Sequence, residues 1–470
     1  MDTPIVDFVR RYAQQRTTRM HMPGHKGCGP LGCEALDITE IAGADELYEA
    51  EGIIARSEAN AAQLFGTART YYSTEGSSQC IRAMLHLALQ MQPAGASRPV
   101  LLAARNAHKA LLYAAALLDF DIRWLWPAPD AAGALCTCPV EPETFACALD
   151  GLAAEGRTPF GVYLTSPDYL GFVQDIAGLA AVCHAHGVPL LVDNAHGAYL
   201  HFLKEGSRHP IRLGADLCCD SAHKTLPVLT GGAYLHLGPS VQADEAAVRN
   251  ALALFGSTSP SYLILQSLDA ANARLADDFR EKLALCRWRL GMLCRELDAF
   301  RPGLALPLTG AHREPLKLTL DAAVLGLSGQ QLAQALREQG VECEYADPRY
   351  LVLMPSPESS AEDFARLQKA LHALCAEASS SAPASDSDAA AFAALAEALQ
   401  AQPRPAAIRE AVLAPQEMVP AAEAVGRICA APAVSCPPAV PIVVSGEVIP
   451  AQALPLFARY GIGRVAVVKD

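Results

Sequence analysis

Short, continuously apolar runs alternate with longer segments of helical periodicity between about residues 53 and 300. The runs RPVLLAARN, FGVYLTSP, VPLLVDNAHG, ADLCCDSAHK and GGAYLHLG have the length of buried strands, whereas SQCIRAMLHLALQM and DIAGLAAVCHAHG read as helices. Strands that are apolar on both faces and are separated by helices predict a mostly parallel sheet covered by helices on both sides. We therefore expect an α/β fold for this part of the chain.

The rest of the pattern predicts smaller pieces around this sheet. Residues 1–52 form an N-terminal helix, over 3–15, and a Gly/Pro-rich loop segment, and residues 53–300 form the large domain. Residues 301–376 form a smaller α/β domain, with PLKLTL and RYLVLMPS as strands around a helix at 328–339. A Ser/Ala/Asp-rich linker over 377–390 precedes a C-terminal domain over 391–470.

Composition and charge narrow the functional class. The formal net charge of −13 disfavours nucleic acid and anionic membranes as partners, and no uninterrupted apolar run reaches the roughly 18 residues of a membrane helix. We expect no signal peptide at the start, and the scattered cysteines, without CxxC pairs, predict reduced thiols in the cytoplasm. No metal site is expected, because His184 and His186, two apart on a helix, cannot face one ligand.

Chemically useful residues follow the predicted strands. Ligands bind at the carboxyl ends of parallel strands, and the residues found there are Asn106, His108, Ser166, Asp193, His196, Ser221 and Lys224. A buried Asp193 needs a cation or hydrogen-bond donors. Lys224, in CCDSAHKTLPVLTGG, is placed where desolvation lowers the pKa of an amine and suits it to Schiff-base chemistry. A plain ion pair between these two residues explains them equally well.

Two further junctions sharpen this picture. In YYSTEGSSQCIRAML, Gly76, Ser77 and Ser78 begin a helix and suit a phosphate, although serine is also an ordinary helix cap. His108 can stack on a flat ligand or simply cap a helix, and Lys109, the competing Schiff-base lysine, is expected to point to solvent. Together, a phosphate cradle, a strand-end acid, a stacking imidazole and a strand-end lysine are the set that pyridoxal phosphate requires.

At this point the sequence resembles the pyridoxal-phosphate-dependent Orn/Lys/Arg decarboxylases of the fold type I (aspartate-aminotransferase) superfamily. The stretches that carry the resemblance, in the family's order, are HMPGHKG, EGIIARSEANAAQLFGTARTYYSTEGSSQ, RNAHKALL, YLTSPDYLGFVQDI, VDNAHGAYLHF, SAHKTLPVLTGGAYLH, FGSTSPSYLILQSLD and EPLKLTL. The resemblance implies a seven-stranded, mostly parallel large domain, a smaller α/β domain and a small C-terminal domain. It also implies decarboxylation of arginine, lysine or ornithine.

The resemblance assigns roles residue by residue. Lys224 carries the cofactor as an imine, Asp193 pairs with its ring nitrogen, and Ala195 and His108 lie against the two ring faces. Lys224 or His223 is the candidate acid that returns a proton to Cα. The remaining cofactor contacts are Gly76, Ser77, Ser78, His196, Ser221 and His223. Thr258 or Ser259 reaches the neighbouring subunit's cofactor, which implies a homodimer or an oligomer of dimers.

The sequence departs from the family pattern at Glu75, Asn194 and Tyr48, where the family usually has Asn, Glu and His. The chain also resembles the short form that lacks the long amino-terminal domain and serves polyamine synthesis.

Candidate receptors for a cationic substrate head group are Asp45, Glu46 and Glu344, and each is alternatively a solvated loop charge. Arg313 keeps an aminotransferase or another fold type I lyase open, because such enzymes anchor a substrate carboxylate with arginine. A catalytically inactive homologue that serves as a binding partner is the alternative outside enzymes.

Overall fold

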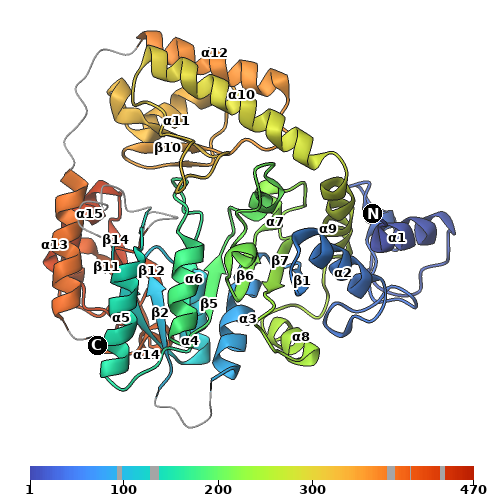
Figure 1. Ribbon diagram of the computed structural model, residues 1–470, viewed down its shortest axis with the longest axis horizontal. Coiled ribbons are helices and arrows are strands. Elements are labelled where there is room, and N and C mark those ends of the chain that lie inside the picture. Colours follow the sequence, from blue (N-terminus) through green and yellow to red (C-terminus); the bar gives the residue numbers. More distant parts are fainter. Residues whose placement is uncertain (93–97, 128–136, 378–386, 403, 435–439, 470) are drawn as a thin grey trace. The chain divides into compact units, whose positions relative to one another are not determined.

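The computed structural model describes residues 1–470 except 93–97, 128–136, 378–386, 403, 435–439 and 470 (Figure 1). The central feature is a seven-stranded sheet in the order β1-β7-β6-β5-β4-β2-β3. Strands β2 and β3, β4 and β5, and β5 and β6 pair in parallel, whereas β7 runs antiparallel to both β6 and β1. The predicted α/β fold with a mostly parallel sheet is thereby confirmed.

The chain divides into two compact units. The first comprises residues 1–96, 158–166 and 176–281, and the second comprises 97–157, 167–175 and 282–470. This division does not follow the predicted segments, because residues 97–157 of the predicted large domain cluster with the C-terminal residues. Residues 378–386 of the predicted linker lie outside the described residues, and a helix begins at Ser387, before the predicted linker ends.

The elements of the first unit are α1 Pro4–Gln14, α2 Ile53–Phe65, β1 Arg69–Ser73, α3 Ser77–Gln90, β4 Gly161–Thr165, α6 Ile176–Ala185, β5 Leu190–Asp193, β6 Leu217–Asp220, α7 Ala222–Thr225, β7 Ala233–Leu237, α8 Glu245–Ala253 and α9 Tyr262–Ala276. Strands β5, β6 and β7 are buried at every position, which is why their sequences lack the polar alternation of a half-exposed strand.

The start of the chain is tied into this unit by a buried carboxylate. Asp269 on α9 accepts hydrogen bonds from the backbone N–H groups of Ile5 and Val6, at 2.9 and 3.0 Å, and from the Ser57 hydroxyl at 2.5 Å. The first N–H groups of a helix have no partner within the helix, so Asp269 supplies what α1 lacks. Burial nevertheless raises the pKa of Asp269 to about 6.

The elements of the second unit are β2 Val100–Ala104, α4 Lys109–Leu118, β3 Asp121–Leu125, α5 Pro142–Ala154, most of α10 Phe279–Phe300, β8 Leu318–Asp321, α11 Gly329–Glu338, β9 Tyr345–Ala346, β10 Tyr350–Leu353, α12 Ala361–Glu377, α13 Ser387–Ala401, α14 Ile408–Leu413, β11 Gln416–Pro420, β12 Ala433–Val434, β13 Val443–Val444, α15 Leu454–Arg459 and β14 Arg464–Val468. Strands β8, β10 and β9 form an antiparallel sheet, as the predicted smaller domain requires, and leucines of α10, α11 and α12 share a core with it.

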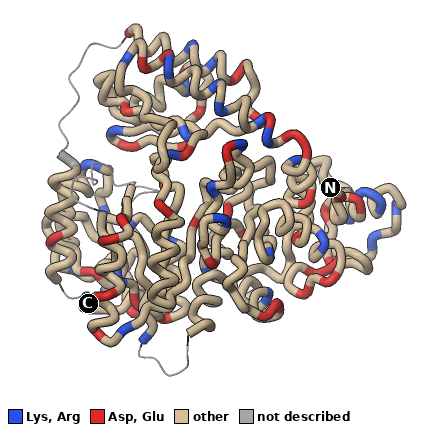
Figure 2. The backbone as a smooth tube through the Cα atoms, viewed as in Figure 1, with Lys and Arg blue, Asp and Glu red and all other residues tan. Residues whose placement is uncertain are grey.

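Charge is mixed rather than segregated on the helices of this small domain. Figure 2 shows acidic and basic residues interspersed along α10 and α12. Among the residues that the structure describes, no helix combines the length and the apolarity that crossing a membrane requires. The described cysteines are all free thiols.

Candidate active site

The ends of β5 and β6 bring the predicted catalytic pair to one edge of the sheet. The two strands are parallel, with Asp193 opposite Cys219, and the chain passes from β6 through Ser221 into the short helix α7 that carries Lys224. The Nζ atom of Lys224 lies 2.9 Å from Nε2 of His196, to which an ammonium group donates. His196 follows Asp193 by three residues, so one strand end supplies both the acid and a partner of the lysine.

Asp193 is buried, 3% exposed, and its carboxylate is held by neighbours other than Lys224. It accepts hydrogen bonds from the Tyr163 hydroxyl at 2.9 Å and the Ala195 N–H at 3.1 Å, and the Cys219 thiol lies at 3.6 Å. Burial and the negative charge of Asp193 together raise the pKa of Tyr163, which keeps the phenol a donor. Asp193 therefore has its own set of hydrogen-bond donors at the end of β5.

The predicted phosphate turn opens the 14-residue helix α3. Gly76 adopts φ 71°, in the region that favours glycine, and no side chain caps the helix. Ser77 instead bonds to Ser221, whose hydroxyl donates to the Ser77 Oγ at 2.7 Å. The alternative of an ordinary serine cap is thus not what the structure has, and hydroxyls from two separate strand ends meet at a helix N-terminus.

A hydrogen-bonded chain behind this turn was missed by the sequence reasoning. Gln79 accepts from the Ser73 hydroxyl at 2.5 Å, and its amide donates to the Tyr48 hydroxyl and the Leu252 carbonyl, both at 2.8 Å. Ser73 in turn accepts from the Glu75 N–H at 3.1 Å. The unusual Tyr48 therefore contacts a residue of the first turn of α3, while the unusual Glu75 is exposed.

Asn194, the third departure from the family pattern, donates to a buried acid that was also missed. Its side-chain amide lies 2.6 Å from Oδ1 of Asp220, whose Oδ2 accepts from His209 at 3.0 Å and from His236 at 3.2 Å. All four side chains are buried. Burial raises the pKa of Asp220, but its interactions with His209 and His236 outweigh burial and hold that pKa well below its usual range.

This cluster also contains a possible set of metal ligands. Ligand atoms of His209, Cys218 and Asp220 lie within 4.8 Å of one another. However, both Asp220 oxygens already accept hydrogen bonds. Burial also raises the pKa of the Cys218 thiol well above its usual range, which disfavours the thiolate form that binds metals. Hydrogen bonding is a sufficient account of the cluster.

His223 is oriented by the backbone. Its Nδ1 lies 3.0 Å from the Gly232 carbonyl, an acceptor, so Nδ1 carries hydrogen and Nε2 is the nitrogen left for other chemistry. The side chain is half-buried. This geometry suits the predicted role as a proton donor beside Lys224.

Other predicted site residues belong to the second unit. His108 caps α4, its Nδ1 accepting from the Ala110 N–H at 3.2 Å, and Lys109 is exposed as expected. Glu344 is exposed and accepts from the Tyr169 hydroxyl at 3.2 Å, and Arg313 is half-buried. Their roles toward the cofactor and the substrate remain predictions.

The predicted acidic receptor at Asp45 is engaged elsewhere. Its two oxygens accept from the N–H groups of Glu46, Glu51, Gly52 and Ile54 at 2.9–3.1 Å. A carboxylate has about four acceptor positions, so these bonds fill it. Asp45 therefore organises its loop and the start of α2, whereas Glu46 is exposed.

Ser78 is half-buried in the first turn of α3. Thr258 and Ser259 lie on an exposed loop between α8 and α9. The exposure of the loop leaves its predicted contact with a neighbouring subunit a prediction.

The residues of the first unit fit pyridoxal phosphate by their chemistry. A methyl group added at Gly76 would meet no atom within 4 Å, so there is open space beside the N-terminus of α3. The hydroxyls of Ser77 and Ser221, together with helix N–H groups, are donors suited to a phosphate. A buried carboxylate and a primary amine at neighbouring strand ends match the ring nitrogen and the aldehyde of the cofactor.

Some of the missed residues carried a signal in the sequence. Tyr163 precedes Thr165 by two positions, so both lie on one face of β4, and Thr165 pairs with Asp193 across the sheet. A polar hydroxyl within an otherwise apolar strand needs a partner, and the strand end next to it offers one. The Asn194–Asp220 contact carried no such signal, because it joins two strands whose register the sequence does not give.

Comparison with known proteins supports one family. The model of the Orn/Lys/Arg decarboxylase major domain matches residues 3–287, and that of the same family's C-terminal domain matches residues 386–460. The uncharacterized protein YaaO of Bacillus subtilis is 32% identical over 75% of this chain and 74% of its own. An arginine decarboxylase of B. subtilis is 29% identical over 95% of this chain and 91% of its own.

Solved structures agree in fold. The constitutive lysine decarboxylase of Escherichia coli superposes with a TM-score of 0.78 at 18% identity, covering 100% of this chain and 82% of that one. The lysine decarboxylase LdcF of Francisella novicida gives 0.77 at 17% identity, covering 99% and 81%. At these identities the likeness supports the fold.

Proposed function

Because this chain belongs to the Orn/Lys/Arg decarboxylase family, we propose that it is a pyridoxal-phosphate-dependent enzyme that removes the α-carboxylate of a basic amino acid as carbon dioxide. The observation that supports the proposal is the parallel pairing of β5 with β6, because Asp193 ends β5 and the chain leads from β6 into α7, which carries Lys224. The product is the corresponding amine, a precursor of polyamines.

Each residue of the site has a defined task in this reaction. When bound, pyridoxal phosphate supplies an electron sink for the pair of electrons left as carbon dioxide departs. Lys224 supplies the amine that holds the cofactor between turnovers, and Asp193 keeps a proton on the ring nitrogen. Ser77, Ser221 and the N-terminus of α3 bind the phosphate. The Nε2 of His223 takes up a proton from solvent and delivers it to the substrate α-carbon.

Arginine is the proposed substrate. The relatives named arginine decarboxylase align over 95% of this chain at 27–29% identity, whereas the constitutive lysine decarboxylase of E. coli aligns over 58% at 25%. Lysine and ornithine offer the same α-amino acid to Lys224 and differ in side-chain length and head group.

The test is product identification. The purified protein with pyridoxal phosphate is incubated separately with arginine, lysine and ornithine, and carbon dioxide and amine are quantified. We expect carbon dioxide and agmatine from arginine. Cadaverine as the main product would identify lysine as the substrate, and putrescine would identify ornithine. Transfer of the amino group to a keto acid without carbon dioxide would replace the decarboxylase with an aminotransferase.

Tyr163→Phe should lower kcat/KM by about 10- to 150-fold, because a hydrogen bond to the charged Asp193 contributes about 1.5–3 kcal/mol. The matched control is Tyr234→Phe on β7, whose buried hydroxyl has no partner among the described residues and whose loss should leave kcat/KM within about twofold. Steady-state decarboxylation kinetics compare the two. Equal effects of both changes would show that Asp193 does not depend on the phenol.

We further propose that the active form is a homodimer or an oligomer of dimers. The exposed loop that carries Thr258 and Ser259 supports this, since it leaves hydroxyls available to a neighbouring subunit's cofactor. Glu344 and Arg313 remain the proposed contacts for the substrate head group and carboxylate.

A further inference from the structure

A buried ion pair reaches from the C-terminal residues to the turn that carries His108. Strand β2 ends at Ala104, and three residues, beginning with Arg105, separate it from His108. The Arg105 side chain is fully buried and its guanidinium donates to both oxygens of Glu447, at 2.7 and 2.9 Å. The two residues are 342 positions apart in the chain.

Further groups fix both members of this pair. Glu447 also accepts from the Val444 N–H at 2.9 Å and lies 3.4 Å from Arg404. The Arg105 guanidinium carbon lies 5.0 and 4.5 Å from the ring centres of Trp124 and Trp126. Burial raises the pKa of Glu447, but Arg105, Arg404 and the Val444 N–H together outweigh burial and lower this pKa overall, so the carboxylate is charged at neutral pH.

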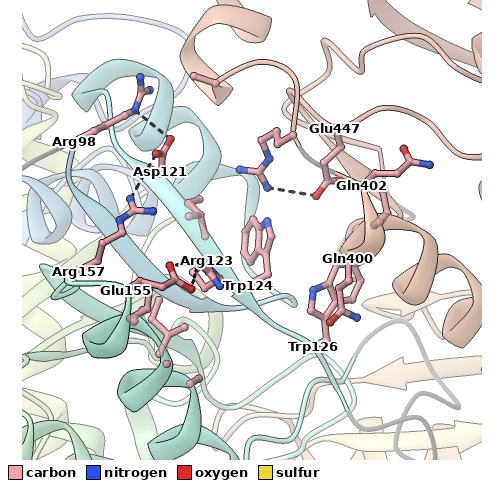
Figure 3. A pocket seen from close by; sticks show the side chains of 18 of the residues that line it. Arg98, Asp121, Arg123, Trp124, Trp126, Glu155, Arg157, Gln400, Gln402 and Glu447 are labelled. Atoms are coloured by element: carbon pink, nitrogen blue, oxygen red, sulfur yellow. Dashed lines mark hydrogen bonds and ion pairs between the residues drawn. The ribbon is translucent and has the colours of Figure 1, made fainter.

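Glu447 also borders a cavity, whereas the Arg105 side chain is fully buried. Trp124, Trp126, Arg404 and Glu447 line a cavity of about 1020 Å³ (Figure 3). Within it the other arginines pair with acids, Arg98 with Asp121 and Arg123 with Glu155.

Such a pair is better suited to fixing geometry than to raising stability. Removing two charges from water costs about as much as their attraction returns, so a buried ion pair is weak evidence for added stability. A bidentate fork, in contrast, fixes the plane and direction of the guanidinium. The backbone of Arg105 is fixed too, since its N–H donates to the Leu125 carbonyl at 3.0 Å.

We propose that Glu447 is a positioning residue for the reaction. By holding Arg105, it sets the turn 105–108 at one end, while the bond from the Ala110 N–H to His108 sets the other end. The C-terminal residues would thereby orient the imidazole of His108, the side chain that the family resemblance assigns to one face of the cofactor ring. This inference rests on the proposed function together with the role that the family resemblance implies for His108.

Arg409 offers a matched control, because it contacts α4, the helix that His108 caps. Arg409 donates to the carbonyls of Ala116 and Leu117, at 3.0 and 3.1 Å, near the C-terminal end of α4. It therefore joins the C-terminal residues to α4 without touching the turn before it. If Glu447 only braced the C-terminal residues, Glu447→Gln and Arg409→Ala would have similar consequences.

The experiment measures pyridoxal phosphate binding to the full-length apo-protein by titration of the visible absorption band. Glu447→Gln should raise the dissociation constant about tenfold and Arg409→Ala should leave it within about twofold. Glu447→Asp, which keeps the charge but is shorter, should show a smaller rise in the same direction. The rise in Glu447→Gln should largely vanish in a His108→Ala background, because residues that act as a unit are not additive.

Two outcomes would overturn the inference. One is an unchanged dissociation constant in both Glu447 variants, and the other is a full, additive rise in the His108→Ala background. Thermal unfolding of each apo-protein shows whether a variant is folded. If Glu447→Gln is misfolded, the dissociation constant of Glu447→Asp decides instead. The binding readout is separate from decarboxylation, so a wild type that binds pyridoxal phosphate but releases no carbon dioxide refutes the proposed function without deciding this inference.

Discussion

Replacing Lys224 by alanine should abolish decarboxylation, lowering kcat by more than about 10³-fold, and should remove the visible absorption band of the lysine-bound cofactor. The physical reason is the position of the residue. Lys224 is the amine that follows β6, beside the strand end that delivers Asp193 and its donors. The band is measured by absorption spectroscopy and the rate by carbon dioxide release.

Lys109→Ala is the control for this experiment. Lys109 was the competing Schiff-base lysine in the sequence, and it is exposed at the first position of α4. Its replacement should leave the visible band in place. A Lys224→Ala protein that retained the band and the activity would disprove the assignment of the cofactor lysine.

Replacing Asn194 by glutamate should destabilise the fold by about 3–5 kcal/mol at neutral pH, because it places a second carboxylate against Asp220. The Asn194 amide now donates to that acid at 2.6 Å in a fully buried position. The family usually has glutamate at this position. In this chain the asparagine amide donates to Asp220 on the neighbouring strand, which a glutamate side chain could not do when charged. Urea-induced unfolding measures the loss.

Two further variants separate charge from size. Asn194→Gln adds the methylene without the charge and should cost only about 1–3 kcal/mol. Asn194→Glu combined with Asp220→Asn restores a donor–acceptor pair and should recover most of the loss. The added glutamate has a raised folded-state pKa, so the deficit should be smallest in acid and should grow as the pH rises. A deficit equal to that of Asn194→Gln at all pH values would contradict the electrostatic explanation.

Much of the fold could be predicted because it depends on local pattern. The runs that became β2, β4, β5, β6 and β7 are buried at nearly every position, and a strand buried on both faces has an unmistakably apolar sequence. The parallel pairing of β5 and β6 then brings the strand ends that lead to Asp193 and Lys224 to one edge of the sheet.

What the sequence could not supply was the set of partners. Asp45 has the charge of a substrate receptor, yet its oxygens are filled by four backbone N–H groups, and acceptor occupancy is a property of the folded loop. Asp269 and Glu447 each act on residues more than 200 positions away. Such contacts depend on how elements pack, which periodicity does not encode.

The environment of Arg105 also equips the protein with an optical reporter. The chain has three tryptophans, and two of them, Trp124 and Trp126, flank the Arg105 guanidinium. The third, Trp288 on α10, is 61% exposed. In a Trp288→Phe protein, every indole that fluoresces therefore lies within about 5 Å of one guanidinium group. The emission of that protein would report on this one locus among 470 residues without any attached dye.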